Sequence, residues 1–410
     1  MSDRQARIPR SQGSRGVVQL SNELEFNLHG AKAQDVIRRW GGSGLLGEVN
    51  PRDVVELNVS LAKDIRELNG MVASEVARLV GVVEAEGGKL YGGSSVLTDT
   101  SRLDPKWYRT TSLSKTLARG LMEVSSQQLV IGVDDEQFGF GLGRFLLKVN
   151  PVLVAVSASS PYRYDIGPGG ADITDTGLQS RRAQQYESMC VYLPPQMWRD
   201  PPSAGTMGEY RAALADVSVL VNCMLREGRL DANMEELYKA RKGADGSTYS
   251  YAPFDRLEPH QVYWPIRIRP DHKNETSVFS LEVRTPDLPL TTKGIQMVNT
   301  LVVGLAYYLM DHDAPQITQH LDGTFSQIKA AASSGLDAIV GAVRIREIAA
   351  ELRECAAQGL REHGFADQCG RLDELDRVLR EGNDAQRIRS YSPRSSSELI
   401  DRLALLLRGA

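Results

Sequence analysis

The sequence is poor in the residues that build disulfide frameworks and soft metal sites. It has 4 cysteines and 6 histidines in 410 residues, and neither type shows the short spacings that hold zinc. We expect reduced thiols and a cytoplasmic protein, because scattered cysteines without a pairing pattern are typical of that compartment. The cysteines are Cys190, Cys223, Cys355 and Cys369. We assign His312, within the sequence DHD, to the end of a helix rather than to a metal site.

Long apolar runs and an excess of charge of one sign are also absent. The 48 Lys and Arg residues nearly balance 52 Asp and Glu residues, for a net charge of -4, which argues against a nucleic-acid partner or an anionic membrane surface. No run approaches the ~18 consecutive apolar residues of a membrane span, so we expect a soluble protein. Residues 1–16 carry arginines without the apolar stretch of a secretory signal, and we expect a frayed tail there.

What the sequence does contain is strict alternation of polar and apolar residues in several segments. In QLSNELEFNLH (19–29), leucines and a phenylalanine stand at the even-numbered positions and two glutamates at odd-numbered ones. This alternation predicts a strand with one apolar and one polar face. RDVVELNVSLAKDI (52–65) and SVFSLEVRT (277–285) repeat the pattern. Residues two apart on a strand share a face, so we expect the following charged residues to converge: Glu23, Glu25, Glu56, Glu282, Arg267, Arg269 and Arg284.

The remaining patterns predict an α+β protein. Helical spacing marks a segment from residue 65 that stops at Gly87-Gly88, and also 106–123, 206–227 and 292–311. A strand is predicted at 127–133, and 262–285 is interpreted as a hairpin whose Pro265 indicates an edge strand. The glycines of GFGLG (139–143) lack the GxGxxG order of a dinucleotide site, so we assign them to helix packing.

We predict loops at 163–182 and at 241–261, the second on the substrate side. From about residue 314 only helices are expected, the last opened by a capping box from Ser395 to Glu398. We therefore divide the chain into the tail 1–16, a catalytic domain 17–313, and a helical C-terminal region 314–410 packed on it.

Clustered carboxylates repel one another, and a hard cation such as Mg²⁺ relieves that repulsion while binding phosphates. Arginines beside them can hold phosphate oxygens with two parallel hydrogen bonds. A single Glu-x-Glu pair is more typical of a solvated strand face, but several pairs on one face indicate a site. A metal-dependent phosphohydrolase also uses such carboxylates, yet it would need His or several Asp ligands, which this sequence does not supply.

The sequence resembles the carboxylate-amine ligases related to glutamate-cysteine ligase over about residues 19–311. The motifs that carry the resemblance are specific in their order and spacing rather than one by one. They are LSNELEF, GEVNPRDVVELNVSLAKDI, LYGGSS, QQLVIGV, LVAVSASSPY, TDTGLQSRR and SLEVRTPDLPLT. The resemblance implies a glutamine-synthetase-like fold, in which a curved, mostly antiparallel sheet forms a funnel-shaped active site flanked by helices.

The resemblance also implies an activity: ATP-dependent formation of an amide, γ-glutamyl in the first instance, through an acyl phosphate with release of ADP. Mg²⁺ or Mn²⁺ would act with ATP, and the substrates would be a small acid such as glutamate and an amine, with cysteine as the family's usual amine. A homodimer is a family expectation. By position, the metal ligands implied are Glu23, Glu25, Glu56 and Glu282.

The other site residues follow from the same resemblance. Arg284 matches the arginine that touches the transferred phosphate, and Arg182 is the candidate for the acid's carboxylate or a phosphate, with Arg181 as an equally good register. We assign Arg267, Arg269 and Gln128 to the nucleotide. The glycine-rich loop with Gly92, Gly93, Ser94 and Ser95 is either part of the amino-acid pocket or a simple turn.

The sequence departs from the family in two places. Gln128 and Val130 stand where the family carries two histidines, and valine can neither bind a metal nor contact phosphate. SSVLTDT replaces a Thr-His-Pro type of sequence in the loop after Gly93, which puts the amino-acid pocket in doubt. Two readings remain open: a working ligase with altered substrates, or a degenerate member that binds nucleotide or amino acid without turnover and acts through partners.

Overall fold

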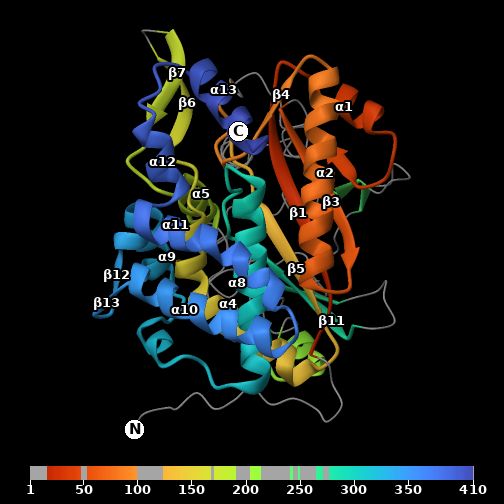
Figure 1. The fold of residues 1–410 in the computed structure, drawn as a ribbon, viewed down its shortest axis with the longest axis vertical. Helices are drawn as coiled ribbons and strands as arrows, with labels where there is room; N and C mark the ends of the chain where they lie inside the picture. The colour runs from red at the N-terminus through yellow and green to blue at the C-terminus, as the bar shows by residue number, and fades with distance from the viewer. Residues whose placement is uncertain are drawn as a thin grey trace.

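The fold is a layer of helices on one face of an antiparallel sheet (Figure 1). The computed structural model describes residues 16–47, 53–98, 123–167, 170–190, 204–213, 241–242, 248–249, 265–270 and 277–409. The predicted α+β class is confirmed, since helices and an unclosed antiparallel sheet are followed by a helical C-terminal region.

The main sheet has seven strands in the order β10-β11-β5-β1-β3-β2, with β4 also paired to β1. All of these pairs are antiparallel. β4 and β5 occupy successive stretches of the same edge of β1, and β3 pairs with its other edge. The strands are β1 (Val17–His29), β2 (Leu45–Gly47), β3 (Val54–Ala62), β4 (Lys89–Tyr91), β5 (Gln127–Val133), β10 (Ile266–Pro270) and β11 (Phe279–Val283).

The apolar side chains of β1 face the helices, as the alternation of the sequence predicts. Leu20, Leu24, Phe26 and Leu28 are fully buried and belong to one large core. Fully burying such a side chain stabilises the fold by roughly 1.5–3 kcal/mol. The helices that cover this face are α1 (Ala33–Trp40), α2 (Ile65–Ala85), α4 (Glu136–Ser157) and α8 (Thr292–Asp311).

Local signals explain where these helices begin. Asp64 and Asp135 each accept a hydrogen bond from the backbone N–H three residues on, and Thr291 does the same for α8. The glycine assignment in GFGLG is also confirmed, because a Cβ at Gly139 would lie 2.5 Å from Phe279 of β11. Among the described residues, α4 is the one helix long and apolar enough to cross a membrane, and most of it is buried inside the protein.

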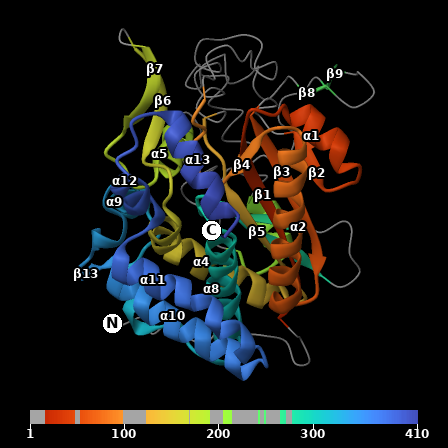
Figure 2. The ribbon, with the colours of Figure 1, turned by 45° about the horizontal axis from the view of Figure 1, so that its top comes forward.

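The C-terminal region packs on α8 through a close helix crossing (Figure 2). A Cβ at Gly359 of α10 would lie 2.4 Å from the carbonyl oxygen of Gly304 in α8, so the two backbones nearly touch. The core is continuous across the predicted boundary at 313/314, which itself stays a prediction. The region contains α9 (Phe325–Ser334), α10 (Ile345–Glu362), α11 (Asp373–Glu381), α12 (Asp384–Ser390), α13 (Ser396–Leu407) and the short 3-10 helices η3 (Gln316–His320), η4 (Gly335–Asp337) and η5 (Ala366–Leu372).

Several sequence-based assignments need correction. Residues 163–182 were expected to form a loop, but β6 (Tyr162–Gly167) and β7 (Gly170–Asp175) make a hairpin there, followed by α5 (Arg181–Cys190). The expectation of helices alone after residue 314 is wrong in detail, since β12 (Ile339–Val340) and β13 (Val343–Arg344) form a small ribbon.

The capping box at the last helix is half formed. Ser395 accepts from the N–H of Glu398, but the Glu398 carboxylate accepts from Arg394 instead of returning to Ser395. The predicted helix at 106–123 lies almost wholly outside the described residues, as do most of the predicted helix at 206–227 and of the loop at 241–261. Within that loop the structure describes β8 (Arg241–Lys242) and β9 (Thr248–Tyr249), which pair with each other.

Candidate active site

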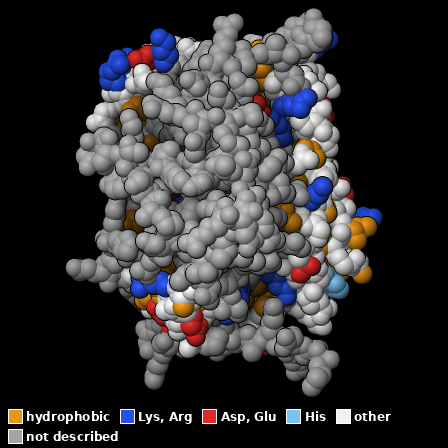
Figure 3. Space-filling view, turned by 180° about the vertical axis from the view of Figure 1, so that it is seen from behind, with side chains coloured by type: hydrophobic (Ala, Val, Ile, Leu, Met, Phe, Trp, Pro, Cys, Tyr) orange, Lys and Arg blue, Asp and Glu red, His pale blue; other side chains and the backbone are white. Residues whose placement is uncertain are grey.

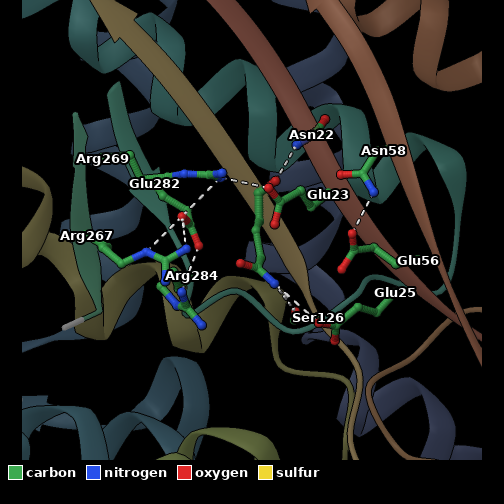
Figure 4. A network of polar contacts seen from close by, with 11 residues as sticks. Asn22, Glu23, Glu25, Glu56, Asn58, Ser126, Arg267, Arg269, Glu282 and Arg284 are labelled. Atoms are coloured by element: carbon green, nitrogen blue, oxygen red, sulfur yellow. Dashed lines mark hydrogen bonds and ion pairs between the residues drawn. The ribbon is translucent and has the colours of Figure 1, made fainter. Parts of the chain in front are cut away.

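The polar side chains of the sheet bring the predicted charged residues together on the face opposite to α2 and α8, as the close-up in Figure 4 shows. Figure 3 shows the molecule from behind the view of Figure 1. Strand register places Glu25 directly opposite Glu56 and Glu23 directly opposite Gln128. Glu282 is opposite Arg267 on one side and Val130 on the other. The close-up in Figure 4 shows that the face has a basic part on β10 and β11 and an acidic part on β1 and β3.

The basic part is built around Glu282, whose side chain is fully buried. Its Oε1 accepts a hydrogen bond from Arg284 Nη1 at 2.9 Å, and its Oε2 accepts from Arg267 Nε at 3.0 Å. Arg269 Nη1 lies 3.3 Å from the same Oε2. Burial by itself would raise the pKa of the Glu282 carboxyl, but the three guanidinium groups outweigh it and hold the pKa below its usual value.

The acidic part contains Glu25 and Glu56, which are half-buried. Gln128 Nε2 donates to Glu25 Oε1 at 3.2 Å, and Asn58 Nδ2 donates to Glu56 Oε1 at 2.5 Å. Burial raises the pKa of Glu25, and the charge of Glu56 raises it further, against the lowering effect of Arg182 and a hydrogen bond from Ser126.

Glu23 connects the two parts. Its Oε1 accepts from Arg269 Nη1 at 2.8 Å, and the same nitrogen lies near Glu282. Burial raises the pKa of Glu23, and so does the Glu282 charge, while Arg269 lowers it. Its net pKa is above the usual value, so the anionic form of Glu23 is incompletely compensated by its described neighbours.

A divalent cation would find its carboxylate ligands in Glu25 and Glu56, with Glu23 nearby. Within the described ranges, no group of three His, Cys, Asp or Glu side chains converges tightly enough to hold a metal by itself. Mg²⁺ commonly uses only one or two carboxylates and takes its other ligands from water and phosphate. Glu25 and Glu56 lie directly opposite each other on the neighbouring strands β1 and β3, and they fit that requirement. Glu282 already contacts three guanidinium groups.

The two candidate arginines of α5 have different surroundings. Arg182 donates from Nη1 to the carbonyl oxygen of Thr285 at 2.9 Å and from Nη2 to that of Arg284 at 2.7 Å. Arg181 instead forms an ion pair with Glu123. Arg182, and not Arg181, is therefore the arginine that lies beside Arg284, the predicted phosphate-binding residue. Its two hydrogen bonds hold the backbone that carries Arg284.

The glycine-rich loop after β4 approaches the segment that follows β11. A Cβ at Gly92 would lie 2.5 Å from the carbonyl oxygen of Pro289, and Gly93 has a φ of +92°. Ser94 Oγ accepts from the N–H of Leu288, and Ser95 Oγ donates to the carbonyl oxygen of Tyr162 at 2.6 Å. These contacts account for the small residues by packing, so their role in substrate binding stays a prediction.

Sequence reasoning missed Asp287, which lies inside the motif SLEVRTPDLPLT. Its carboxylate is buried and accepts from Ser159 N at 2.9 Å, Ser160 Oγ at 2.6 Å and Ser180 Oγ at 2.8 Å. It thereby joins the segment after β11 to the end of α4 and the start of α5. The signal available was a lone aspartate between two prolines, which a turn explains equally well.

The family to which the chain belongs makes it an ATP-dependent ligase that forms carbon-nitrogen bonds. The chain belongs to glutamate-cysteine ligase family 2, which matches residues 1–404. No curated protein sequence matches it.

Two solved structures show the same fold. Glutamate–cysteine ligase from Francisella tularensis, in complex with AMP, superposes with a TM-score of 0.58 at 12% identity, over 95% of this chain and 89% of that one. A bifunctional glutathione synthetase from Pasteurella multocida gives 0.57 at 14% identity, over 95% of this chain and 51% of that one. The chain thus spans about half the length of the second protein.

Proposed function

We propose that the protein joins the carboxylate of a small acid, glutamate in the first instance, to an amine, using ATP and passing through an acyl phosphate. The observation that carries this proposal is the division of one sheet face into carboxylates around Glu25 and Glu56 and guanidiniums around Glu282. A nucleotide with a divalent cation presents the complementary charges. The family and the fold support an ATP-dependent ligase of this class.

The chemistry follows from the weakness of a carboxylate as an electrophile. A carboxylate oxygen attacks the γ-phosphorus of ATP, so that a new oxygen-phosphorus bond forms and the bond to ADP breaks. The amine nitrogen then attacks the acyl carbon, phosphate leaves, and the amine loses a proton. Phosphoryl transfer depends mainly on positioning and on electrostatic stabilisation of the phosphoryl oxygens.

The described side chains would divide this work as follows. Arg284, with Arg267 and Arg269, would bind phosphoryl oxygens, because guanidinium groups match them with paired hydrogen bonds. Mg²⁺ or Mn²⁺ held by Glu25 and Glu56, with Glu23 nearby, would neutralise phosphate charge when bound. Arg182 would position Arg284, and Gln128 would contact the nucleotide. The residues proposed to contact the substrate are Arg181, Gly93, Ser94 and Ser95.

The second candidate function is a degenerate member that binds nucleotide or amino acid and acts through partners. The observation that favours it is the pair Gln128 and Val130 at the positions of the family's histidines. Gln128 Nε2 donates within the protein, to Glu25 Oε1 and to Ser126 Oγ at 3.3 Å. This reading predicts binding of ATP without release of ADP.

The experiment that separates the two measures ADP release from Mg-ATP with glutamate and a panel of amines, cysteine included, with mass spectrometry of the product. A ligase releases ADP with a matching glutamyl conjugate. Binding of ATP without release of ADP for any amine of the panel would favour the degenerate member.

Substitutions at the site test the assignment directly. Glu25→Gln and Arg284→Ala should each lower turnover by about 10²–10³-fold, as loss of one preorganised electrostatic group commonly does. Their circular dichroism and urea midpoints should stay near those of the parent. Asp401→Asn on α13, which removes an exposed ion pair with Lys89 of β4, is the matched control and should keep full activity. Normal turnover in both site variants would refute the proposed site.

Location and assembly stay predictions. Cytoplasmic location is expected from the reduced cysteines, and among the described residues Cys355 and Cys369 are free. A homodimer is expected from the family and is tested by light scattering of the purified protein.

A further inference from the structure

We propose that Asn299 of α8 is a positioning residue of the site, which acts through a chain of three buried amides on Glu23 and Gln128. The inference rests on the proposed function, because it concerns the part of the sheet face assigned to the metal and the nucleotide. The amide chain consists of Gln127, Asn299 and Asn22. It lies on the helix-covered side of the sheet, behind Glu23 and Gln128.

The amide chain runs between two backbone carbonyl groups. Gln127 Nε2 donates to the carbonyl oxygen of Ile295 at 3.1 Å and to Asn299 Oδ1 at 2.8 Å. Asn299 Nδ2 donates to Asn22 Oδ1 at 2.6 Å, and Asn22 Nδ2 donates to the carbonyl oxygen of Gln128 at 3.1 Å. Because a carbonyl oxygen can only accept, these two ends determine which way each of the three amides points.

Both strand residues of the amide chain are immediate neighbours of site residues. Asn22 precedes Glu23 on β1, as Figure 4 shows, and Gln127 precedes Gln128 on β5. Glu23 and Gln128 are directly opposite each other in the pairing of β1 with β5. Successive side chains of a strand point to opposite faces of the sheet. The amides behind the sheet therefore hold the two stretches of backbone from which Glu23 and Gln128 project.

The pairing of β1 with β3 is irregular at the same place. The register of β1 against β3 shifts by one residue between Leu20 and Asn22. A bulge of this kind bends a strand and changes the direction of its side chains. The backbone just before Glu23 is therefore less closely defined by β3, and the amide chain adds a constraint on it from α8.

Stability alone does not account for the amide chain. All three amide side chains are fully buried, next to apolar core residues such as Leu24 and Leu129. Gln127 Oε1 has no hydrogen-bond partner within the part of the chain that the structure describes, so the burial is not fully compensated. Apolar side chains of similar size would avoid that cost. Hydrogen bonds are directional, however, so the amides define the position of β1 and β5 against α8 more narrowly than apolar packing would.

A second polar cluster on α8 provides a matched control. Thr300 follows Asn299 directly and is equally buried. Its Oγ1 donates to the carbonyl oxygen of Gln296 at 2.7 Å and accepts from Asn69 Nδ2 of α2 at 3.0 Å. These contacts join α8 to α2 rather than to the strands that carry the site. Loss of the Thr300 hydroxyl therefore removes buried hydrogen bonds of α8 without touching the amide chain.

The test compares Asn299→Leu with Thr300→Val in the full-length protein. Asn299→Leu should raise both the Kd for Mg-ATP, measured by calorimetry, and the KM for Mg-ATP by about 10-fold, the scale of one lost hydrogen bond to a charged group. The KM for glutamate should stay within about 3-fold of the parent, well under a tenfold change, and Thr300→Val should change none of these values by more than that. A variant that is only less stable contains less active enzyme and keeps both KM values.

Asn22→Leu/Asn299→Leu guards against a single variant that does not fold. It replaces both partners of one buried hydrogen bond by apolar groups, a change that is commonly close to neutral for stability. Gln127 keeps its hydrogen bond to the carbonyl oxygen of Ile295. The double variant should have a urea midpoint closer to that of the parent than Asn299→Leu has, and it should still show the tenfold rise in the Kd for Mg-ATP.

Hydrogen-exchange mass spectrometry without nucleotide measures the constraint on the strands. Asn299→Leu should speed the exchange of amides in peptides that cover β1 and β5, whereas Thr300→Val should not. Unchanged exchange in both strands would overturn the inference, as would an unchanged Kd for Mg-ATP in the folded double variant. If the parent binds Mg-ATP but releases no ADP, the proposed turnover fails, while the Kd and the exchange pattern still decide the inference.

Discussion

Replacement of Asp287 by alanine should be the most damaging single change outside the charged face. The carboxylate is almost fully buried and accepts three hydrogen bonds, from Ser159 N, Ser160 Oγ and Ser180 Oγ. Burial raises its pKa, while Arg182 and these donors lower it. Asp287→Ala removes the shared acceptor and leaves three buried donors to be satisfied by other means.

The magnitude follows from the number of donors. A buried donor without a partner costs about 1–3 kcal/mol, so three of them predict a loss of about 3–9 kcal/mol in the free energy of unfolding. A domain of ordinary stability has about 5–15 kcal/mol in total, so the loss is a large part of it. Asp287→Asn keeps the shape and one acceptor oxygen, and it should lose about 2 kcal/mol.

Equilibrium urea unfolding of the parent and the variants measures this loss, provided that the slope against denaturant is unchanged. The matched control is Asp175→Asn, which weakens a partly exposed ion pair with Arg389 and should cost about 1 kcal/mol or less. A loss below about 1 kcal/mol in Asp287→Ala would show that the donors find other partners. The claim that Asp287 holds the segment after β11 would then be wrong.

Asp287 is also expected to affect catalysis at a distance. The segment it holds begins two residues after Glu282 and includes Arg284, whose carbonyl oxygen accepts from Arg182. Asp287→Asn should therefore lower kcat more than it raises KM, since substrate contacts remain and the alignment of Arg284 changes. An unchanged kcat in a folded variant would show that the hydrogen bonds of Asp287 do not affect catalysis.

Other expected outcomes concern the core and the thiols. Gly139→Ala should lower the free energy of unfolding by about 1–3 kcal/mol, because its Cβ would press on Phe279. Gly81→Ala on α2 places its Cβ more than 4 Å from any neighbouring atom and should stabilise the protein by up to about 1 kcal/mol. Urea midpoints of the two variants that shift in the same direction would contradict this. Burial raises the pKa of the Cys355 thiol to about 11. At pH 8 it should therefore resist iodoacetamide in the folded protein and react in urea, and rapid alkylation of the folded protein, seen by mass spectrometry, would refute its burial.

The sheet could be predicted from the sequence because its strands are two-faced. The range 127–133 matches β5, and 292–311 matches α8, since both segments have clear periodicity and end at recognisable signals. The hairpin of β6 and β7 was missed although YRYDIG alternates, because the alternating stretch is short and the glycines and charges of YRYDIGPGGADITD are typical of a loop. In such a segment the polar composition resembles that of a loop.

The composition of the candidate site was predictable, but its internal contacts were not. Parity alone places Glu23 and Glu25 on one face of their strand, because side chains two apart point the same way, and it places Glu56 on the polar face of its own strand. Which carboxylate receives the arginines depends on the register of β10 against β11 and on side-chain direction. The contact of Arg182 with Thr285 joins residues 103 apart, and no local pattern indicates such a pair.

The absence of the two histidines that the resemblance implies can be understood from the same register. Val130 is directly opposite Glu282, and cross-strand neighbours have Cβ atoms about 4.5–5.5 Å apart. A histidine there would lie next to three guanidiniums, which disfavour its protonated form. An imidazole would thus add little charge to a site that already has three guanidinium groups around Glu282.

Val130→His therefore tests whether the arginines replace the lost histidines. If they do, the variant should bind metal-free ATP within about 3-fold of the parent, well under the ~1.4 kcal/mol of a tenfold change, and release ADP no faster. Val130→Ala is the control for the change in packing, since it removes side-chain volume without adding a ring nitrogen. A gain of about tenfold or more in ADP release, in Val130→His but not in Val130→Ala, would show that the imidazole is a missing part of the machinery. The basic cluster around Glu282 would then be an incomplete substitute for it.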